Sequence, residues 1–575
     1  MASVDLALVG NSAVAALIDG QGAVVWWCWP KLDGDPLFCG LLDEPGRGIF
    51  GVSLLGQREA RIVSPPGAPV VVTRLEAEDG SVLEVVDVVP AGEPAPIELV
   101  RTLRPVEGRP AVRLVFDPRA GWGAREATLT AGDTGLYLRG IEPAVHVSTN
   151  LPNAALRGEP VALDGPGHVV LSAGPLPGVL AEHAQAALDR TEAWWAAWYD
   201  ELEIPAVCAD VVRPAARALA LCTSQATGAI VAALTTSVPE EPGTGRNWDY
   251  RYCWLRDAYF VVRALYRLGD RQRVARYGAW LRAIVAASPD GPAAAVRPAR
   301  RAPPRGALRR GPAGLPRRGA GAHRQRRLPQ IQHDVYGQAV LCAILAGDTD
   351  YGLLAPLAER AWALWDRPDA GVWEYRAIAH VHTSSAAFCW AALDAVARHA
   401  PDGEQPLWRE RADHVREQIL ARAWDPSLGA LSGALDGPLL DASVLLLPQL
   451  GLVDWQDPRF VATVDVLDRK LLRTGEGHAH MMRYVVADDF GAPHHAFTAC
   501  SFWAIQALIG VGRLDEAETR FRALLQQRSV AGLLSEDLDT KTGEAWGNYP
   551  QTYCSVGLIE CALDLAAARA LAGVD

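Results

Sequence analysis

Short apolar runs separated by Gly, Pro and Asp fill the first 180 residues. The runs AALI and AVVWWCW, joined by Asp19-Gly20-Gln21-Gly22, have the pattern of a β-hairpin. Similar runs follow at regular intervals: PVVVTRLEAE, SVLEVVDVVP, IELVRTLRP, AVRLVFDP, TGLYLRG and GHVVLSAG. This spacing predicts an antiparallel β-sandwich over residues 1–180.

The period of the apolar positions then changes from that of strands to that of a helix. The stretch AEHAQAALDRTEAWWAAWYDELE places Trp194, Trp195 and Trp198 on one broad aromatic face. We expect a linker helix, within residues 181–206, that packs between two domains.

Residues 207–575 alternate helical runs with loops, for example AYFVVRALYRLG, SSAAFCWAALDAVARHA and AFTACSFWAIQALIGVG. This length suits twelve helices of roughly 30 residues each, loops included. Several runs are apolar nearly all round, as in helices buried on more than one side. We predict a C-terminal (α/α)6 barrel with its active site in the loops at one end.

The charge balance narrows the class of partner. The 575 residues carry a formal net charge of −12, although the segment 291–329 alone holds eleven arginines and no Asp, Glu or Lys. A surface this acidic argues against a nucleic-acid partner, which needs clustered Lys and Arg. It suits an enzyme with a neutral substrate.

The ten cysteines are scattered and form no CxxC pair, which is typical of buried thiols in a reducing compartment. The N-terminus lacks the pattern of a signal peptide, and no uncharged apolar run reaches the ~18 residues of a membrane span. We therefore expect a cytoplasmic protein without membrane contact. The oligomeric state stays open, with a homo-oligomer as one option.

The histidine pairs do not have the spacing of a metal site. His478 and His480, and His494 and His495, have no carboxylate or Cys at a recognised distance along the chain. We expect neither a metal nor another cofactor.

The densest unusual stretch is RNWDYRYCWLRDAYF, residues 246–260. It mixes aromatic residues with Arg251, Arg256, Asp249 and Asp257 just before a helix. One interpretation is a buried salt-bridge network. The other is a sugar subsite, where Asp and Arg bind vicinal hydroxyls and an aromatic ring covers the apolar face of the sugar. The residues alone leave both open.

A second stretch, PDAGVWEYR, places Glu374 between Trp373 and Tyr375 in a glycine-containing loop. Aromatic surroundings disfavour the charged form of a carboxyl group and raise its pKa. A general acid needs that property. The alternative is an exposed loop glutamate, which is the commoner case.

A third stretch, GLLSEDLDTKTGEAWGNYPQTY, crowds Glu536, Asp537, Asp539 and Glu544 into one loop. One of them could be a general base that deprotonates water. A solvated acidic loop or a cation site are the alternatives, although the spacing is too irregular for an EF-hand.

Together with the N-terminal ALVGNSAVAALIDGQGAVVWWCWPKLDGDPLF and with DDFGAPHHAFTACSFW, these motifs resemble bacterial members of glycoside hydrolase family fifteen, the glucoamylase, glucodextranase and trehalase group. The resemblance covers nearly the whole chain. It implies a β-sandwich, a helical linker and an (α/α)6 barrel. It also implies an inverting, exo-acting hydrolase of α-glucosides, of trehalase or glucoamylase type.

The resemblance also implies roles for individual residues. Glu374 in the VWE motif corresponds to the general acid and Glu536 in LLSE to the general base. In the same way, the pocket for the non-reducing glucose is formed by Trp254, Arg256, Asp257 and Trp373. One departure is Gln338, where family members often have Glu after DVYG.

The arginine-rich segment 291–329 stands where the family usually carries a loop resembling GYRGSRPVRIGNAA. The run GLPRRGAGAHRQRRLP, read one base over in GC-rich codons, can give GYRGGARAHIGNAAYR. We therefore favour two compensating frameshifts, near Gly291 and near Pro329, which would impair the pocket. A natural disordered insertion and a nucleic-acid-binding arm are the alternatives. Resequencing the gene decides: an unambiguous reading of the present frame removes the frameshift hypothesis.

Two other functions remain open from sequence. A disaccharide phosphorylase would need one acid and a phosphate pocket but no base carboxylate, so Glu536 favours hydrolysis. A carbohydrate-binding protein without activity would bind sugar and release no glucose. The preferred α-glucoside, whether trehalose, maltose, dextran or a longer glucan, is not fixed by these motifs.

Overall fold

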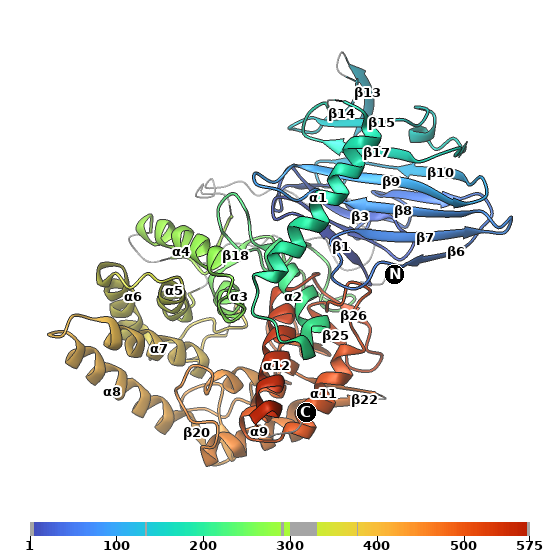
Figure 1. The fold of residues 1–575 in the computed structure, drawn as a ribbon. Coiled ribbons are helices and arrows are strands. Elements are labelled where there is room, and N and C mark those ends of the chain that lie inside the picture. Colours follow the sequence, from blue (N-terminus) through green and yellow to red (C-terminus); the bar gives the residue numbers. More distant parts are fainter. Residues whose placement is uncertain are drawn as a thin grey trace.

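The computed structural model describes residues 5–132, 135–176, 178–288, 292–298, 331–376, 378–475 and 477–571. An N-terminal pair of antiparallel sheets and a C-terminal array of helices lie side by side, with one long helix between them (Figure 1). Most of the arginine-rich segment, residues 299–330, lies outside the described residues. The frameshift hypothesis therefore stays a prediction.

Two sheets form the predicted sandwich. The first has the order β1-β2-β3-β5-β10-β16, with β4 on β3, and the second has the order β13-β14-β15-β17-β9-β8-β7-β6. Their bounds are β1 (Ala7–Gly10), β2 (Ala15–Ile18), β3 (Val24–Trp29), β4 (Asp35–Phe38), β5 (Phe50–Leu54), β6 (Gln57–Ile62), β7 (Val71–Ala77), β8 (Val82–Val88), β9 (Glu98–Glu107), β10 (Ala111–Phe116), β13 (Thr128–Gly132), β14 (Gly135–Arg139), β15 (Val145–Thr149), β16 (Val161–Ala162) and β17 (Gly167–Ser172). The predicted hairpin is confirmed, since β2 pairs antiparallel with β3.

One hydrophobic core joins the inner faces of the two sheets. A buried ion pair lies within the second sheet beside this core: Arg101 on β9 donates to both oxygens of Asp87, its partner on the adjacent strand β8, at 2.7 and 2.8 Å. Arg101 also donates to the backbone carbonyls of Gly22 and Phe50, which belong to the first sheet or its turn. Arg101 therefore pairs with a carboxylate in its own sheet and links that sheet to the first through two hydrogen bonds.

Helix α1 (Leu180–Asp200) runs from the sandwich to the helical domain (Figure 1). It contacts β8, β9 and β17. Trp195 and Trp198 are buried and pack edge to face, whereas Trp194 is 36% exposed. Trp198 Nε1 donates to Asp270, which caps helix α4 (Arg271–Ala286) of the helical domain. Two of the three tryptophans of the predicted aromatic face therefore join the domains.

The helical domain follows the alternation expected of an (α/α)6 barrel. Inner elements pack in a circuit, α3 on α5, α5 on α7, α7 on η3, η3 on α10, α10 on α12 and α12 on α3. The elements between them in sequence pack outside this circuit. The bounds are α2 (Ala209–Cys222), α3 (Leu255–Arg267), α4 (Arg271–Ala286), α5 (Asp334–Leu345), α6 (Tyr351–Leu364), α7 (Thr383–His399), α8 (Gln405–Ala423), η3 (Ala442–Leu446), α9 (Pro458–Leu471), α10 (Thr498–Gly510), α11 (Leu514–Leu525) and α12 (Thr552–Leu571).

Twelve regular helices were expected, but one inner position is occupied by the short 3-10 helix η3 instead. Short elements supply the connections. They are η1 (Ala155–Arg157), η2 (Ala206–Cys208), β11 (Arg119–Ala120), β12 (Arg125–Glu126), β18 (Cys253–Trp254), β19 (Ala295–Val296), β20 (Trp424–Asp425), β21 (Ala430–Leu431), β22 (Leu472–Gly475), β23 (His478–Met481), β24 (His495–Phe497), β25 (Asp537–Asp539) and β26 (Ala545–Trp546).

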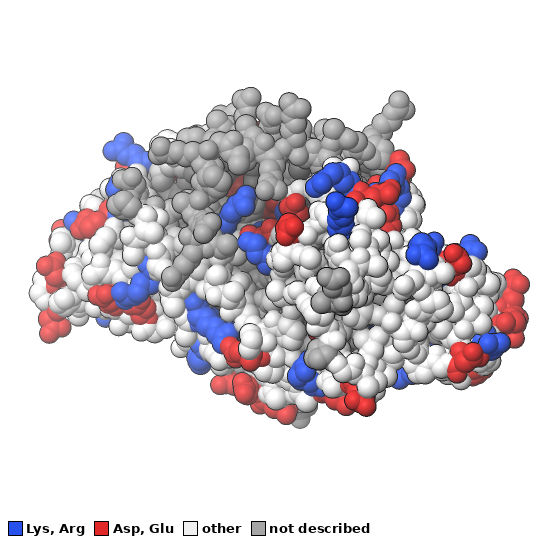
Figure 2. Space-filling view, turned by 90° about the horizontal axis from the view of Figure 1, so that it is seen from above, with Lys and Arg blue, Asp and Glu red and all other residues white. Residues whose placement is uncertain are grey.

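The state of the cysteines and the distribution of surface charge can be compared with what the composition indicated. All ten cysteines are free and buried. Within the described ranges, no helix has the length and apolar character that crossing a bilayer requires. On the face shown in Figure 2, acidic and basic side chains are interspersed, so its described residues form no extended patch of one sign.

Candidate active site

A cavity of about 790 Å³, counting its open mouth, lies where the inner helices begin. Trp254 directly precedes α3, Phe497 directly precedes α10, and Tyr553 is the second residue of α12. The remaining wall comes from loops. The lining residues are aromatic or charged with few exceptions: Glu240, Arg246, Trp248, Tyr250, Trp254, Arg256, Asp257, Val372, Trp373, Glu374, Tyr375, Arg483, Asp488, Asp489, Phe490, Phe497, Trp503, Gln551 and Tyr553.

Three of the expected substrate-binding residues, Trp254, Arg256 and Asp257, stand together at the start of α3. Trp254 ends β18, and its partner strand β19 is part of the segment 292–298. Arg256 Nη2 donates to Asp257 at 3.2 Å. Burial raises the pKa of Asp257 to about 6, and the Arg256 charge opposes that rise.

The stretch 246–260 was interpreted either as a buried salt-bridge network or as a sugar subsite, and the structure fits each interpretation to a different pair of residues. Arg251 donates to both oxygens of Asp249, at 2.9 and 2.8 Å, and also to the carbonyl of Gly34 in the sandwich domain. Its guanidinium lies over the Trp122 ring. This pair therefore joins the domains, while Arg256 and Asp257 face the cavity.

Glu374 lies in the cavity wall on a strained loop. Its φ is +59°, in the left-handed region that residues with a side chain seldom adopt. Its Oε1 accepts a hydrogen bond from Arg256 Nη2 at 3.0 Å. The loop approaches His382 closely: a Cβ at Gly371 would stand 2.6 Å from the His382 ring. Packing therefore fixes the position of this carboxyl group.

Trp373, also expected in the pocket, lines the cavity beside Glu374. Its Nε1 donates to Asp441 Oδ2 at 2.8 Å, and its ring packs against Phe497 and Trp503. Asp441 is buried and caps η3, and burial raises its pKa to about 6. The one inner element that is not a regular helix thus anchors the ring.

Glu536 does not line the cavity. Its side chain has no exposed surface, and it lies against Tyr250, which does line the cavity. The backbone N–H of Asn548 donates to its Oε2 at 2.9 Å. Gly547, with φ +77°, makes this approach feasible, because a Cβ there would lie 2.6 Å from that of Glu536. Burial and the neighbouring Glu240 raise the pKa of Glu536 to about 8.

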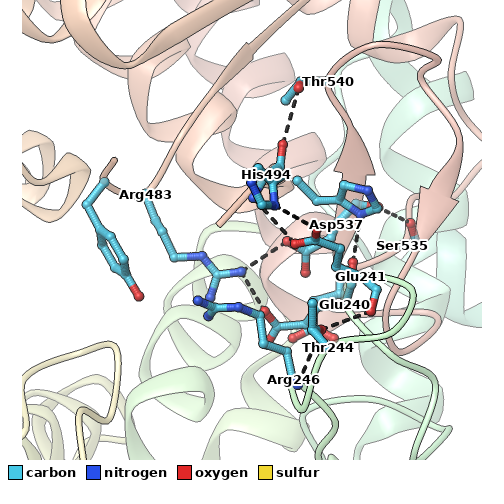
Figure 3. A network of polar contacts seen from close by, with 12 residues as sticks. Glu240, Glu241, Thr244, Arg246, Arg483, His494, Ser535, Asp537 and Thr540 are labelled. Carbon is cyan, nitrogen blue, oxygen red and sulfur yellow. Dashed lines mark hydrogen bonds and ion pairs between the residues drawn. The ribbon is translucent and has the colours of Figure 1, made fainter. Parts of the chain in front are cut away.

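Three buried carboxylates meet at this wall, and one of them, Glu240, also lines the cavity. One oxygen from each of Glu240, Glu536 and Asp537 lies within 4.8 Å of the others. Arg483 Nη2 donates to Glu240 at 2.6 Å and to Asp537 at 3.1 Å (Figure 3). Among the described residues, this is the group with the geometry of a cation site. Arg483 supplies a positive charge to it.

A second part of the wall was not singled out residue by residue in the sequence. Arg246 Nη2 donates to Asp488 at 2.6 Å and to the Gly491 carbonyl at 2.8 Å. Trp248 packs edge to face on Phe490. Both groups fall within quoted motifs, RNWDYRYC and DDFGAPHHAF, so the density of aromatic and charged residues in these motifs could have indicated them. That the two motifs contact each other across more than 230 residues of chain could not be predicted from the sequence.

The histidine pairs lie elsewhere. His478 stacks on His480, while His494 contacts Glu241 and His495 bonds to the Glu240 carbonyl. These residues are absent from the described lining of the cavity.

Comparison with known proteins extends this picture. A family model described as Glycosyl hydrolases family 15 matches residues 208–515, and one described as Trehalase-like, N-terminal matches residues 4–151. A trehalase of Mycolicibacterium smegmatis is 27% identical over 98% of this chain and 91% of its own length. A trehalase of Thermoplasma volcanium is 24% identical over 96% of this chain and 92% of its own.

Among solved structures, a bacterial glucoamylase complexed with acarbose superposes with a TM-score of 0.71. The match covers 98% of this chain and 94% of that chain, at 14% sequence identity. At this identity the likeness shows the fold, a sheet domain joined to a helical domain.

Proposed function

Because the chain belongs to glycosyl hydrolases family 15 and is a glucose-releasing glycoside hydrolase, we propose that it cleaves α,α-trehalose into two glucose molecules. The choice of trehalose rests on the relatives that bear the name trehalase and that this chain matches over nearly its whole length. The bond would be broken with inversion at the anomeric carbon.

The observation that carries the proposal is the placement of Glu374. Its carboxyl group stands in a cavity walled by tryptophans, next to an Arg-Asp pair. Rings cover the apolar faces of a sugar, and Arg with Asp bind adjacent hydroxyl groups. In this geometry Glu374 acts as the general acid that protonates the glycosidic oxygen.

Glu536 acts as the general base in this proposal. It takes a proton from the water that attacks the anomeric carbon from the opposite face. Since Tyr250 and not Glu536 lines the cavity, that proton reaches Glu536 through the Tyr250 hydroxyl or after the Tyr250 side chain has moved. An inverting reaction needs ~6.5–9.5 Å between the two carboxyl groups to leave room for the water.

Glucose release from trehalose, maltose, isomaltose and a soluble glucan tests the assignment. We expect trehalose to react fastest, without any requirement for phosphate, and the variant Glu374→Gln to be nearly inactive. Phosphate-dependent formation of glucose 1-phosphate would identify a phosphorylase instead. A trehalose-induced rise in melting temperature without glucose release would identify a binding protein.

A further inference from the structure

Two aromatic side chains from loops far apart in sequence pack on each other in the cavity wall. Trp248 and Phe490 both line the cavity, and their rings meet edge to face with centres 5.3 Å apart. Both side chains are partly exposed, whereas Trp254 and Asp257 at the start of α3 are buried. The ring pair Trp248–Phe490 is therefore closer to solvent than the part of the wall that α3 supplies.

Hydrogen bonds fix the orientation of Trp248. Its Nε1 donates to Glu240 Oε1 at 2.6 Å, and the other oxygen of the same carboxyl group accepts from Arg483, also at 2.6 Å. The backbone carbonyl of Trp248 accepts from the N–H of Ser237 at 2.9 Å. Since the indole and the backbone are both bonded, the ring keeps one position in the wall.

The turn that carries Phe490 is fixed as well. Its backbone N–H donates to Asp488 Oδ1 at 2.7 Å. Arg246 Nη2 donates to the same carboxylate oxygen at 2.6 Å and to the Gly491 carbonyl at 2.8 Å. The Tyr484 hydroxyl donates to the second oxygen of Asp488. These bonds hold the residues on both sides of Phe490, so its ring is presented to the cavity from a defined turn.

Arg376, two positions after Glu374, joins the ring pair to the loop that carries this carboxyl group. The Cζ of Arg376 lies 4.6 Å from the centre of the Trp248 ring and 5.2 Å from that of Phe490. Its backbone N–H donates to Asp489 Oδ2 at 2.6 Å. A guanidinium group this close to two rings is attracted to both. The ring pair and the Glu374 loop are therefore held together as one wall.

We propose that the ring pair is the surface on which the leaving glucose packs, the unit that departs when the bond is protonated. Arg376 is then a positioning residue that holds this surface beside Glu374. The inference rests on the proposed function, which places the glucose attacked by water on the Arg-Asp pair at the start of α3. A general acid stands beside the bond between two sugar units, so its neighbours meet both units. Arg256 is one such neighbour, and the ring pair is another.

The chemistry of the ring pair suits an uncharged sugar. Two rings packed edge to face form an apolar corner, against which the C–H groups of a glucose ring can pack. This contact is present in the bound substrate and in the transition state alike. Its loss should therefore raise KM and change kcat little. A substrate whose leaving group is not a sugar does not make the contact at all.

Comparison of trehalose with α-glucosyl fluoride tests the inference, because the leaving group of the fluoride is a single atom. The full-length protein is compared with Phe490→Ala and Arg376→Met, and with Arg411→Met as the matched control. Arg411 also lies over two rings, those of Trp362 and Trp408, and is absent from the cavity lining. KM and kcat are measured for both substrates, and thermal melting checks that each variant folds.

We expect KM for trehalose to rise about tenfold in Phe490→Ala, which removes one of the two rings. In Arg376→Met, which keeps both rings but loses the cation between them, we expect a rise of about threefold. In both variants kcat for trehalose and KM for the fluoride should stay close to the parental values. Arg411→Met should match the parental protein on both substrates.

A parental KM for trehalose in folded Phe490→Ala overturns the proposal. An equal rise of KM on both substrates overturns it too, because the rings would then contact the glucose that water attacks. If Phe490→Ala does not fold, Arg376→Met decides by the same criteria. A parental protein that cleaves maltose but not trehalose refutes the choice of trehalose in the proposed function. The ring pair is then tested separately, by the same comparison with maltose in place of trehalose.

Discussion

Arg256 donates a hydrogen bond to Glu374 at 3.0 Å while the backbone of Glu374 stays in the left-handed region. The hydrogen bond and the strained backbone both fix the carboxyl group at the cavity wall, as expected for a group that must meet one oxygen of the substrate.

Glu374→Gln tests the role of this group as an acid. With trehalose, turnover should fall ~10²–10⁴-fold, because the glutamine keeps the contact with Arg256 but has no proton to give. With α-glucosyl fluoride, whose leaving group needs no proton, the same variant should keep most of the parental rate. The measurement is kcat on both substrates.

Glu536→Gln is the matched comparison, since a missing base slows attack by water on either substrate. We expect it to be slow on both. Equal losses for Glu374→Gln on trehalose and on the fluoride would show that Glu374 does not act as the acid.

Glu240→Gln tests the cause of the raised pKa of Glu536. Burial and the Glu240 charge hold that pKa at about 8, above the usual value of a glutamate, so below pH 8 most of the base is protonated. Removing the Glu240 charge lowers the pKa and leaves more base ionised at pH 6. The ratio of kcat/KM at pH 6 to that at pH 8 should therefore rise, even if both values fall.

Glu241→Gln is the control for that ratio, because Glu241 contacts the exposed His494 and is absent from the cavity lining. An unchanged or lower ratio in Glu240→Gln would mean that Glu240 does not raise the pKa of the base.

Asp441→Asn tests the anchoring of Trp373. The amide can present an N–H where Asp441 Oδ2 now accepts from Trp373 Nε1, which disrupts a hydrogen bond to a buried carboxylate. Losing a bond of ~1.5 kcal/mol should raise KM for trehalose about tenfold. Steady-state kinetics check this, with Asp457→Asn as control, because Asp457 caps α9 and is absent from the cavity lining. A parental KM in folded Asp441→Asn would contradict the anchoring.

The sequence pattern was sufficient for the two-part architecture, since strand and helix periods differ plainly on either side of α1. The motifs that carry the family resemblance also contain Trp254, Arg256, Asp257, Trp373 and Glu374, which the structure brings together in the lining of one cavity; their roles stay predictions. The sequence pattern gave no indication that Tyr250, and not Glu536, would line the cavity. The position of Glu536 depends on its close approach to Gly547, a contact in space that the pattern does not contain.

Glu240 illustrates the same limit. It lies in a loop, VPEEPGTG, without periodicity or a recognised motif. Its importance comes from Arg483, which lies 243 positions away in sequence and donates to it at 2.6 Å. Short stretches can indicate which kinds of chemistry a site can carry. Contacts between distant loops decide which carboxyl groups pair with the same arginine, as Glu240 and Asp537 do with Arg483.

The first-formed products of trehalose cleavage test the central claim most directly. Inversion with Glu374 as acid and Glu536 as base predicts, in time-resolved proton NMR before mutarotation, equal amounts of α-glucose and β-glucose, with label from ¹⁸O-water in the β-anomer alone. Initial release of α-glucose only, or label in the α-anomer, would contradict the account.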